Sequence, residues 1–194
     1  CIGAWAWGLS RMLDALEKIP AIDTTRCATV GHSRLGKASL WAGAQDTRFA
    51  LVISNNSGEG GAALKYRHLG ETPAIITKSF PHWFTATYSN YGPTPWTCPV
   101  DQHQLVALVA PRLAYVASAT EDLWADPKGE FLAALNAQPV YDLYGLPGVT
   151  LKTQPAPDTP VGDHVGYHLR TGKHDINAYD WTQYFNFADR HYSK

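Results

Sequence analysis

Apolar positions along this chain follow two spacings, one typical of buried strands and one typical of helices. Short apolar runs such as 112–118 predict strands buried on both faces. Longer stretches with apolar residues three and four positions apart, such as 4–18, predict amphipathic helices. The expected elements are a helix at 4–18, a strand at 26–31, a helix at 34–45, a strand at 49–54, a helix at 101–109, a strand at 112–118, a helix at 128–144, a strand at 164–170 and a helix at 178–191.

Strands that alternate with helices in this way predict an α/β fold with a mainly parallel sheet. We expect a three-layer α/β/α sandwich, formed by residues 1–194 as a single domain. The proline-rich stretch 154–160 is interpreted as a loop, because a strand still follows it. A glycine-rich loop at 55–61 and an insertion with little helix at 62–100 complete the pattern.

The stretch 28–37 predicts a serine on a sharp turn between a strand and a helix. An apolar approach runs into Ser33, and helix-forming residues begin at Arg34. A serine at such a turn projects clear of the sheet, and the next backbone N–H can stabilise an oxyanion. The usual G-x-S-x-G pattern is not met, since Leu35 stands two residues after the serine and Gly36 follows it. Taken alone, the stretch also fits a turn whose serine caps the helix.

Two later loops supply an acid and a histidine in the order that α/β-hydrolases use. A strand-like run opens into a loop with Glu121 and Asp122, and the last expected strand opens into a loop with His174. The order serine, acid, histidine differs from that of chymotrypsin and subtilisin. The shorter side chain would hold an imidazole N–H more rigidly, so we choose Asp122. The predicted nucleophile, base and acid are therefore Ser33, His174 and Asp122.

Several motifs, met in a fixed order, carry a resemblance to a known family. They are GHSRLGK at 31–37, WAGAQDTRFA at 41–50, SGEGG at 57–61, the segment 101–112 that ends in APR, and WADPKG at 124–129. Together they resemble the bacterial branch of the glucuronoyl esterases, carbohydrate esterase family fifteen. The resemblance covers nearly the whole chain. It implies an α/β-hydrolase that cleaves the ester between glucuronic (4-O-methyl-glucuronic) acid side groups of xylan and lignin alcohols.

The resemblance also implies roles for residues around the ester. Arg34 resembles the side chain that supplements the backbone oxyanion donor. Lys37, Glu71 and Trp124 resemble positions that contact the sugar. The alternatives are a solvated helix lysine for Lys37 and a core aromatic for Trp124. A Ser–His–Asp hydrolysis needs no metal or organic cofactor.

The acid departs from the pattern of many relatives. They carry a glutamate directly before the Ser-Gly of the glycine-rich loop, where this chain has Asn56. An amide cannot stabilise an imidazolium by charge, so Asp122 is the expected acid. Glu59 is the reserve candidate, and its alternative is a solvated loop residue. Fungal members carry cysteines at the positions of His32 and Asp175, so the resemblance implies that their disulfide is absent here.

Composition limits the partners that we expect. The formal net charge of −1 comes from 16 basic and 17 acidic residues without long runs of one sign, so neither nucleic acid nor a membrane surface is predicted as a partner. No stretch approaches the roughly 20 apolar residues of a membrane-spanning helix. Three cysteines without C-x-x-C spacing favour neither a zinc site nor a complete disulfide framework, and Cys27 is expected in a buried strand.

The start of the chain suggests that part of the domain is missing. A hydrolase sheet normally has several strands before the helix that leads to the nucleophile strand. We therefore expect the chain to cover the C-terminal half or so of the catalytic domain, with any signal peptide outside it. The expected protein is a secreted or periplasmic monomer that acts on a glucuronoxylan or lignin–carbohydrate ester.

Two other functions stay open at this point. Another esterase of the same fold, such as an acetyl-xylan esterase, or a peptidase would keep the triad without gathering the sugar-contacting positions in one pocket. A catalytically incomplete carbohydrate-binding fragment would not assemble the triad.

Overall fold

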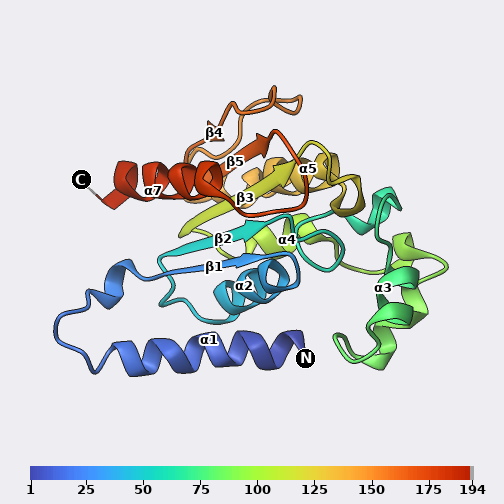
Figure 1. Ribbon diagram of the computed structural model, residues 1–194, viewed down its shortest axis with the longest axis horizontal. Helices are drawn as coiled ribbons and strands as arrows, with labels where there is room; N and C mark the ends of the chain where they lie inside the picture. Colours follow the sequence, from blue (N-terminus) through green and yellow to red (C-terminus); the bar gives the residue numbers. More distant parts are fainter. Residues whose placement is uncertain (193–194) are drawn as a thin grey trace.

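The computed structural model of the protein describes residues 1–192 and contains a five-stranded sheet with helices on both faces (Figure 1). The elements are α1 (Ile2–Leu16), β1 (Ala28–His32), α2 (Arg34–Gln45), β2 (Leu51–Asn55), α3 (Pro73–Ser79), α4 (Gln102–Ala107), β3 (Leu113–Ala119), α5 (Pro127–Asn136), α6 (Gln138–Asp142), β4 (Val161–Gly162), β5 (Val165–Arg170) and α7 (Ala178–Tyr192). Short 3₁₀ helices lie in several of the connections, one of them at Leu123–Ala125 after β3.

The sheet has the order β1-β2-β3-β5-β4 and is parallel apart from β4, which pairs antiparallel with β5. Every residue of β2, β3 and β5 is buried, which explains why apolar residues in these strands do not alternate with exposed polar ones. The polar residues of β5, His168 and Arg170, are buried as well. Parallel strands end at one edge of a sheet, and this edge is where ligands bind in open α/β sheets. Ser33 follows β1, Asn56 follows β2, and the loops after β3 and β5 carry Asp122 and His174.

Helices cover the two faces of the sheet unequally. Tyr184 and Phe187 of α7 pack on one face against Leu51, Ile53 and Tyr115. The larger core lies on the other face, where α2, α4 and α5 pack, and α1 covers the outer side of α2 (Figure 1). This layered α/β arrangement agrees with the predicted fold class. Within residues 1–192, no helix combines the length and apolar character needed to cross a bilayer.

The structure corrects two details of the predicted elements. The helix expected over 128–144 is divided into α5 and α6, and Pro139 lies in the first turn of α6, where its missing N–H does no harm. Cys27 lies just before β1 and is half-buried, so it is not a buried strand residue. The other expected helices and strands are present, with ends within two residues of the predicted ones.

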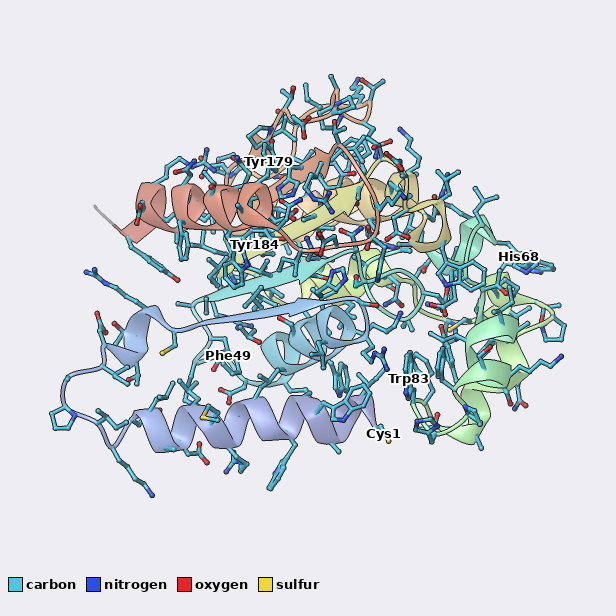
Figure 2. All side chains as sticks on the ribbon, viewed as in Figure 1. Cys1, Phe49, His68, Trp83, Tyr179 and Tyr184 are labelled. Carbon is cyan, nitrogen blue, oxygen red and sulfur yellow. The ribbon has the colours of Figure 1, made fainter. Side chains whose placement is uncertain are left out.

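The insertion at 62–100 packs against the N-terminal ends of α1 and α2. Ile2, Ala38, Ile76 and Trp83 form a small core between these segments. The carbonyl of Trp83 also accepts hydrogen bonds from the amino group of Cys1 and the N–H of Ile2, and Figure 2 shows Trp83 beside Cys1. The insertion therefore lies next to the end of the sheet where α2 begins.

Candidate active site

Ser33 occupies the turn between β1 and α2 in a backbone conformation that favours glycine. Its φ is 58° and its ψ is −126°. The turn brings the backbone of Gly31 so close to α2 that an added Cβ would lie 1.9 Å from the carbonyl oxygen of Leu35. The Ser33 hydroxyl makes no capping hydrogen bond to the described helix. Ser33 therefore stands at the N-cap position of α2 in a strained turn, but its side chain does not cap the helix.

The departure from the G-x-S-x-G pattern has a structural explanation. The side chain of Leu35 is 52% exposed, so this position does not need glycine. Gly36 lies where the helix approaches its neighbours, and an added Cβ there would lie 2.9 Å from the Ser57 Cβ and 3.0 Å from the Gly31 carbonyl oxygen. The position that needs glycine is therefore 36 in this chain, one residue later than in the G-x-S-x-G pattern.

A buried carboxylate contacts the imidazole of His174. Asp122 Oδ2 lies 2.6 Å from His174 Nδ1 and accepts a second hydrogen bond of 2.9 Å from Asn56 Nδ2. The neighbouring Glu121 is exposed. Burial opposes ionisation of Asp122, but the hydrogen bonds from His174 and Asn56 outweigh it and lower the pKa of Asp122. The hydrogen bond to Asp122 raises the pKa of His174 against the effect of its own burial.

Ser33 and His174 line one pocket of about 300 Å³. Of the residues predicted to have catalytic, oxyanion or sugar-contacting roles, all line it except the reserve acid Glu59. The lining residues are Ser33, Arg34, Lys37, Asn56, Ser57, Gly58, Glu71, Phe80, Trp83, Asp122, Trp124, Ala125 and His174. The structure thus gathers side chains from the turn after β1, the loop after β2, the insertion and the loops after β3 and β5.

Lys37 is buried, with three acceptors around its ammonium group. Its Nζ donates to the carbonyls of Ser57 and Glu59 at 2.6 Å each, and Glu71 Oε2 lies 3.4 Å away. The side chain is only 4% exposed, so Lys37 is not a solvated helix lysine. Burial lowers the pKa of Lys37, and the carboxylates of Glu71 and Glu59 oppose that shift. The two carbonyl contacts tie α2 to the loop after β2.

Glu59, the reserve candidate for the acid, contacts Tyr88 and not His174. Its carboxylate accepts a hydrogen bond from the Tyr88 hydroxyl of the insertion. The side chain is buried, so it is not a solvated loop residue either, and this burial raises the pKa of Glu59 to about 7. In the structure the carboxylate that contacts His174 belongs to Asp122.

Aromatic side chains form the wall of the pocket beside Arg34. The rings of Phe80 and Trp83 stack with centroids 3.9 Å apart and an interplanar angle of 5°. The Arg34 guanidinium lies 5.4 Å from the centroid of the Trp83 ring, within the range of a cation–π contact. Trp124 is 55% exposed, which excludes a role as a core aromatic. Sequence reasoning missed Phe80 and Trp83, because the insertion at 62–100 was interpreted only as a segment with little helix.

Glu130 on α5 is a third residue that sequence reasoning missed. Its Oε1 accepts from the backbone N–H groups of Ser57 and Gly58 at 2.7 and 3.0 Å, and its Oε2 accepts from the Ser118 hydroxyl at 2.7 Å. Complete burial raises the pKa of Glu130 to about 7. The WADPKG motif stops one residue before it. Glu130 and Lys37 thus hold the loop after β2 from opposite sides, one by its N–H groups and the other by its carbonyls.

The described residues contain no group of three or more His, Cys, Asp or Glu side chains placed to hold a metal ion. His168 is buried in β5, where its ring nitrogens lie 3.0 Å from the Tyr115 hydroxyl and 2.8 Å from Asp180 Oδ1. This histidine is part of the packed polar interior.

Comparisons of the sequence with known proteins agree on one family. A family model described as glucuronyl esterase, fungi, matches residues 1–145. A prokaryotic protein named Carbohydrate esterase MZ0003 is 55% identical over 98% of this chain and 44% of its own length. The 4-O-methyl-glucuronoyl methylesterase 1 of Wolfiporia cocos is 37% identical over 74% of this chain and 38% of its own length.

Solved structures agree with these sequence matches. A promiscuous CE15 esterase from a marine bacterial metagenome has a TM-score of 0.96 and 55% identity, over 98% of this chain and 48% of that one. The glucuronoyl esterase from Solibacter usitatus gives a TM-score of 0.94 and 53% identity, over 97% and 48%. The Hypocrea jecorina catalytic domain gives 0.79 and 30%, over 97% and 51%. The chain spans about half the length of the relatives it matches. It belongs to the glucuronoyl esterase family, carbohydrate esterase family 15, and has the α/β-hydrolase fold.

Proposed function

We propose that this chain carries the catalytic triad of a serine esterase that hydrolyses esters of glucuronic or 4-O-methyl-glucuronic acid. In this proposal Ser33 is the nucleophile, His174 the base and Asp122 the acid. The observation that carries it is the contact of 2.6 Å between Asp122 and His174 in the pocket that Ser33 also lines. This contact favours catalysis over a purely carbohydrate-binding role, because a binding site has no need of an oriented imidazole.

The reaction follows from the roles of the three groups. His174 Nε2 takes the proton of the Ser33 hydroxyl as Oγ attacks the ester carbonyl, and Asp122 stabilises the imidazolium that forms. The carbonyl oxygen becomes negative, and the backbone N–H and guanidinium of Arg34 donate to it. The tetrahedral intermediate then expels the alcohol, which takes the proton from His174. Water attacks the resulting acyl-enzyme by the same route and releases the uronic acid.

The residues around the triad suit a sugar acid. Glu71 can accept hydrogen bonds from sugar hydroxyls, and the exposed face of Trp124 can stack on a pyranose ring. Lys37 lines the same pocket, and it can donate to a sugar hydroxyl in place of its contact of 3.4 Å with Glu71. A related enzyme, the glucuronoyl esterase of Sporotrichum thermophile, has been solved as a mutant in complex with methyl 4-O-methyl-beta-D-glucopyranuronate. We extend that ligand class to this chain and propose glucuronoxylan esters of lignin alcohols as the substrate.

The proposed substrate also implies where the protein acts. Xylan is a polymer that lies outside the cell that degrades it, so the protein is proposed to act after secretion or in the periplasm.

The second candidate function is a broader carbohydrate esterase that also takes acetyl esters, and it is favoured by one observation. The relative with 55% identity from a marine bacterial metagenome is described as promiscuous.

The deciding experiment measures kcat/KM of the full-length protein on benzyl glucuronate, on an acetylated xylo-oligosaccharide and on a simple alkyl ester. A clear preference for benzyl glucuronate supports the proposal. A preference for the acetyl ester contradicts it and supports the second candidate. In either case Ser33→Ala serves as the inactive control.

A further inference from the structure

Arg170 stands at the end of β5, four residues before His174, and its side chain is turned into the protein. Its Nη2 donates to the carbonyl of Lys173 at 2.8 Å and to that of Asp175 at 3.0 Å, the two residues on either side of His174. Its Nη1 donates to the Thr171 carbonyl at 3.1 Å. The Arg170 side chain is 4% exposed, whereas that of His174 is 43% exposed. A buried cation therefore holds the loop that presents a solvent-accessible imidazole.

Asp180 fixes the position of this cation. Arg170 Nε donates to Asp180 Oδ2 at 2.9 Å, and the same oxygen accepts from the Asn177 N–H at 2.8 Å. The Asp180 side chain is completely buried at the start of α7. A guanidinium has five N–H donors fixed in one plane, so it can hold a carboxylate and three carbonyls in a set geometry, whereas an ammonium has three donors that rotate about a flexible stem. The pair is thus a rigid link between α7 and the loop at 171–175.

The same carboxylate also reaches the strand that leads to Ser33. Asp180 Oδ1 accepts from Asn55 Nδ2 at 3.2 Å, and Asn55 Oδ1 lies 2.6 Å from His32 Nδ1. The ring of His32 lies against that of His174, with centroids 4.4 Å apart. One buried network therefore supports the imidazole from its backbone and from one side of its ring.

The loop has few other attachments at this point. Thr171 and Gly172 are held separately, by Asp158 and by Thr120. For residues 173–175, however, the backbone hydrogen bonds to other parts of the chain within 1–192 are those from Arg170. We propose that Arg170, anchored by Asp180, is a positioning residue that sets the backbone on both sides of His174. The inference rests on the proposed function, in which His174 is the base.

Misplacement of a catalytic group by about 1 Å can cost roughly 100-fold in rate, so loosening this loop should appear in kcat. Arg170→Lys keeps the positive charge and removes the planar set of donors. Arg112→Lys is a matched control, because the Arg112 guanidinium also donates to three backbone carbonyls, those of Gly43, Asp46 and Phe49. Arg112 precedes β3, at the opposite end of the parallel strands from the pocket.

The test uses the full-length protein with benzyl glucuronate. Arg170→Lys should lower kcat by roughly 10- to 100-fold with little change in KM. The acid limb of the pH profile of kcat/KM should lie at lower pH in this variant, because a looser contact with Asp122 no longer raises the pKa of His174. The charge at position 170 is kept, and the ionisable groups around His174 are not substituted; they include His32, Asp122, Asp175, Lys37 and Glu130. Arg112→Lys should lower the melting temperature without moving kcat or the acid limb.

The inference would be overturned if Arg170→Lys and Arg112→Lys lowered kcat only in proportion to the stability that each loses. A normal kcat in Arg170→Lys would overturn it as well. Should Arg170→Lys not fold, Asp180→Asn replaces it, since the amide keeps the shape and removes the charge that anchors Arg170. The same loss in kcat and the same limb shift are then expected, and their absence counts against the inference. Ser33→Ala and His174→Ala are measured alongside. If either stays active, the proposed function has failed; if both are inactive while Arg170→Lys is normal, only the role of Arg170 has failed.

Discussion

The side-chain amide of Asn56 donates a hydrogen bond of 2.9 Å to the oxygen of Asp122 that also contacts His174. A carboxylate at position 56 would lie against Asp122, and two such groups in contact cannot both stay ionised without strong cost. The amide avoids this conflict. The proposed role of Asp122 is thus to supply the charge beside His174, and that of Asn56 is to orient this carboxylate.

Asp122→Asn should therefore lower kcat by roughly 10³- to 10⁴-fold, because it removes the charge and the acceptor that hold the imidazole. Glu59→Gln should leave kcat within a few fold, since the Glu59 carboxylate contacts Tyr88. Steady-state kinetics of the two variants on benzyl glucuronate provide the check. The reverse result, an active Asp122→Asn with an inactive Glu59→Gln, would mean that the acid has been assigned to the wrong loop.

Ser33→Ala and His174→Ala should each remove turnover by roughly 10³-fold or more, and the double variant should be no worse than either single one. The two side chains are proposed to act in one proton transfer, so removing either one already removes the contribution of both. Initial rates of the three variants, corrected for spontaneous ester hydrolysis, test this expectation. Modest losses that multiply in the double variant would show that the two side chains act independently.

The pH dependence of activity should follow His174. A base must be neutral, and the hydrogen bond to Asp122 raises the pKa of His174 above its ordinary value of 6.5. The acid limb of kcat/KM should therefore lie above pH 6.5. The same shift stabilises the fold below pH 6.5, and this contribution is lost as the pH rises through the folded-state pKa. A pH–rate profile, with melting temperatures of the protein and of His174→Gln, checks both signs; a limb below 6.5 contradicts them.

Glu130 should control stability rather than catalysis. Its pKa is raised from 4.5 to about 7, so the folded state keeps a proton that the unfolded state releases in this range. The free energy of unfolding should therefore fall as the pH rises from 4.5 to about 7. Glu130→Gln should remove the part of this decrease that is due to Glu130. Glu59 has a similar shift and should contribute a separate share.

Glu130→Ala should be much more harmful than Glu130→Gln. It would leave the buried N–H groups of Ser57 and Gly58 without an acceptor, at a cost of about 1–3 kcal/mol for each group. Denaturant titrations of the two variants at several pH values would reveal the difference. Equal stability of the two would mean that water or another group can satisfy the loop.

Specificity should depend on Glu71 and Trp124. Neither side chain has a part in acyl transfer, so Glu71→Gln and Trp124→Ala should raise KM for glucuronate esters more than for simple alkyl esters. The expected loss is about 1–3 kcal/mol, or roughly 10- to 100-fold in kcat/KM. Lys37 is a poorer probe, because its substitution would also release the loop after β2. Equal damage to both ester classes would exclude a sugar contact for the residue concerned.

Much of the fold could be predicted from local pattern alone. Strands buried on both faces read as unbroken apolar runs, and the helices between them show a 3.6-residue period, so their order follows directly. Pro139 marks the break between α5 and α6, and the apolar period that continues across it favours a single long helix. β4 has only two residues, which is too short for any pattern to mark.

The pocket was predictable where residues stand directly after strands. Ser33, Asp122 and His174 belong to this class, because parallel topology brings the ends of these strands to one edge. Trp83 comes from the insertion, whose path is set by tertiary packing against Ile2 and Ala38. Glu130 sits on an ordinary helix, and nothing in the sequence indicates that its carboxylate points at the backbone of Ser57.

The packing of Gly36 against Gly31 and Ser57 bears on how such proteins are found and altered. A pattern search written as G-x-S-x-G passes over this chain, whereas G-x-S-x-x-G retrieves it. For directed evolution the two neighbouring positions are opposites. Leu35 projects outward within two residues of Ser33, so a saturation library at position 35 should yield folded variants that differ beside Ser33, whereas one at position 36 should return glycine.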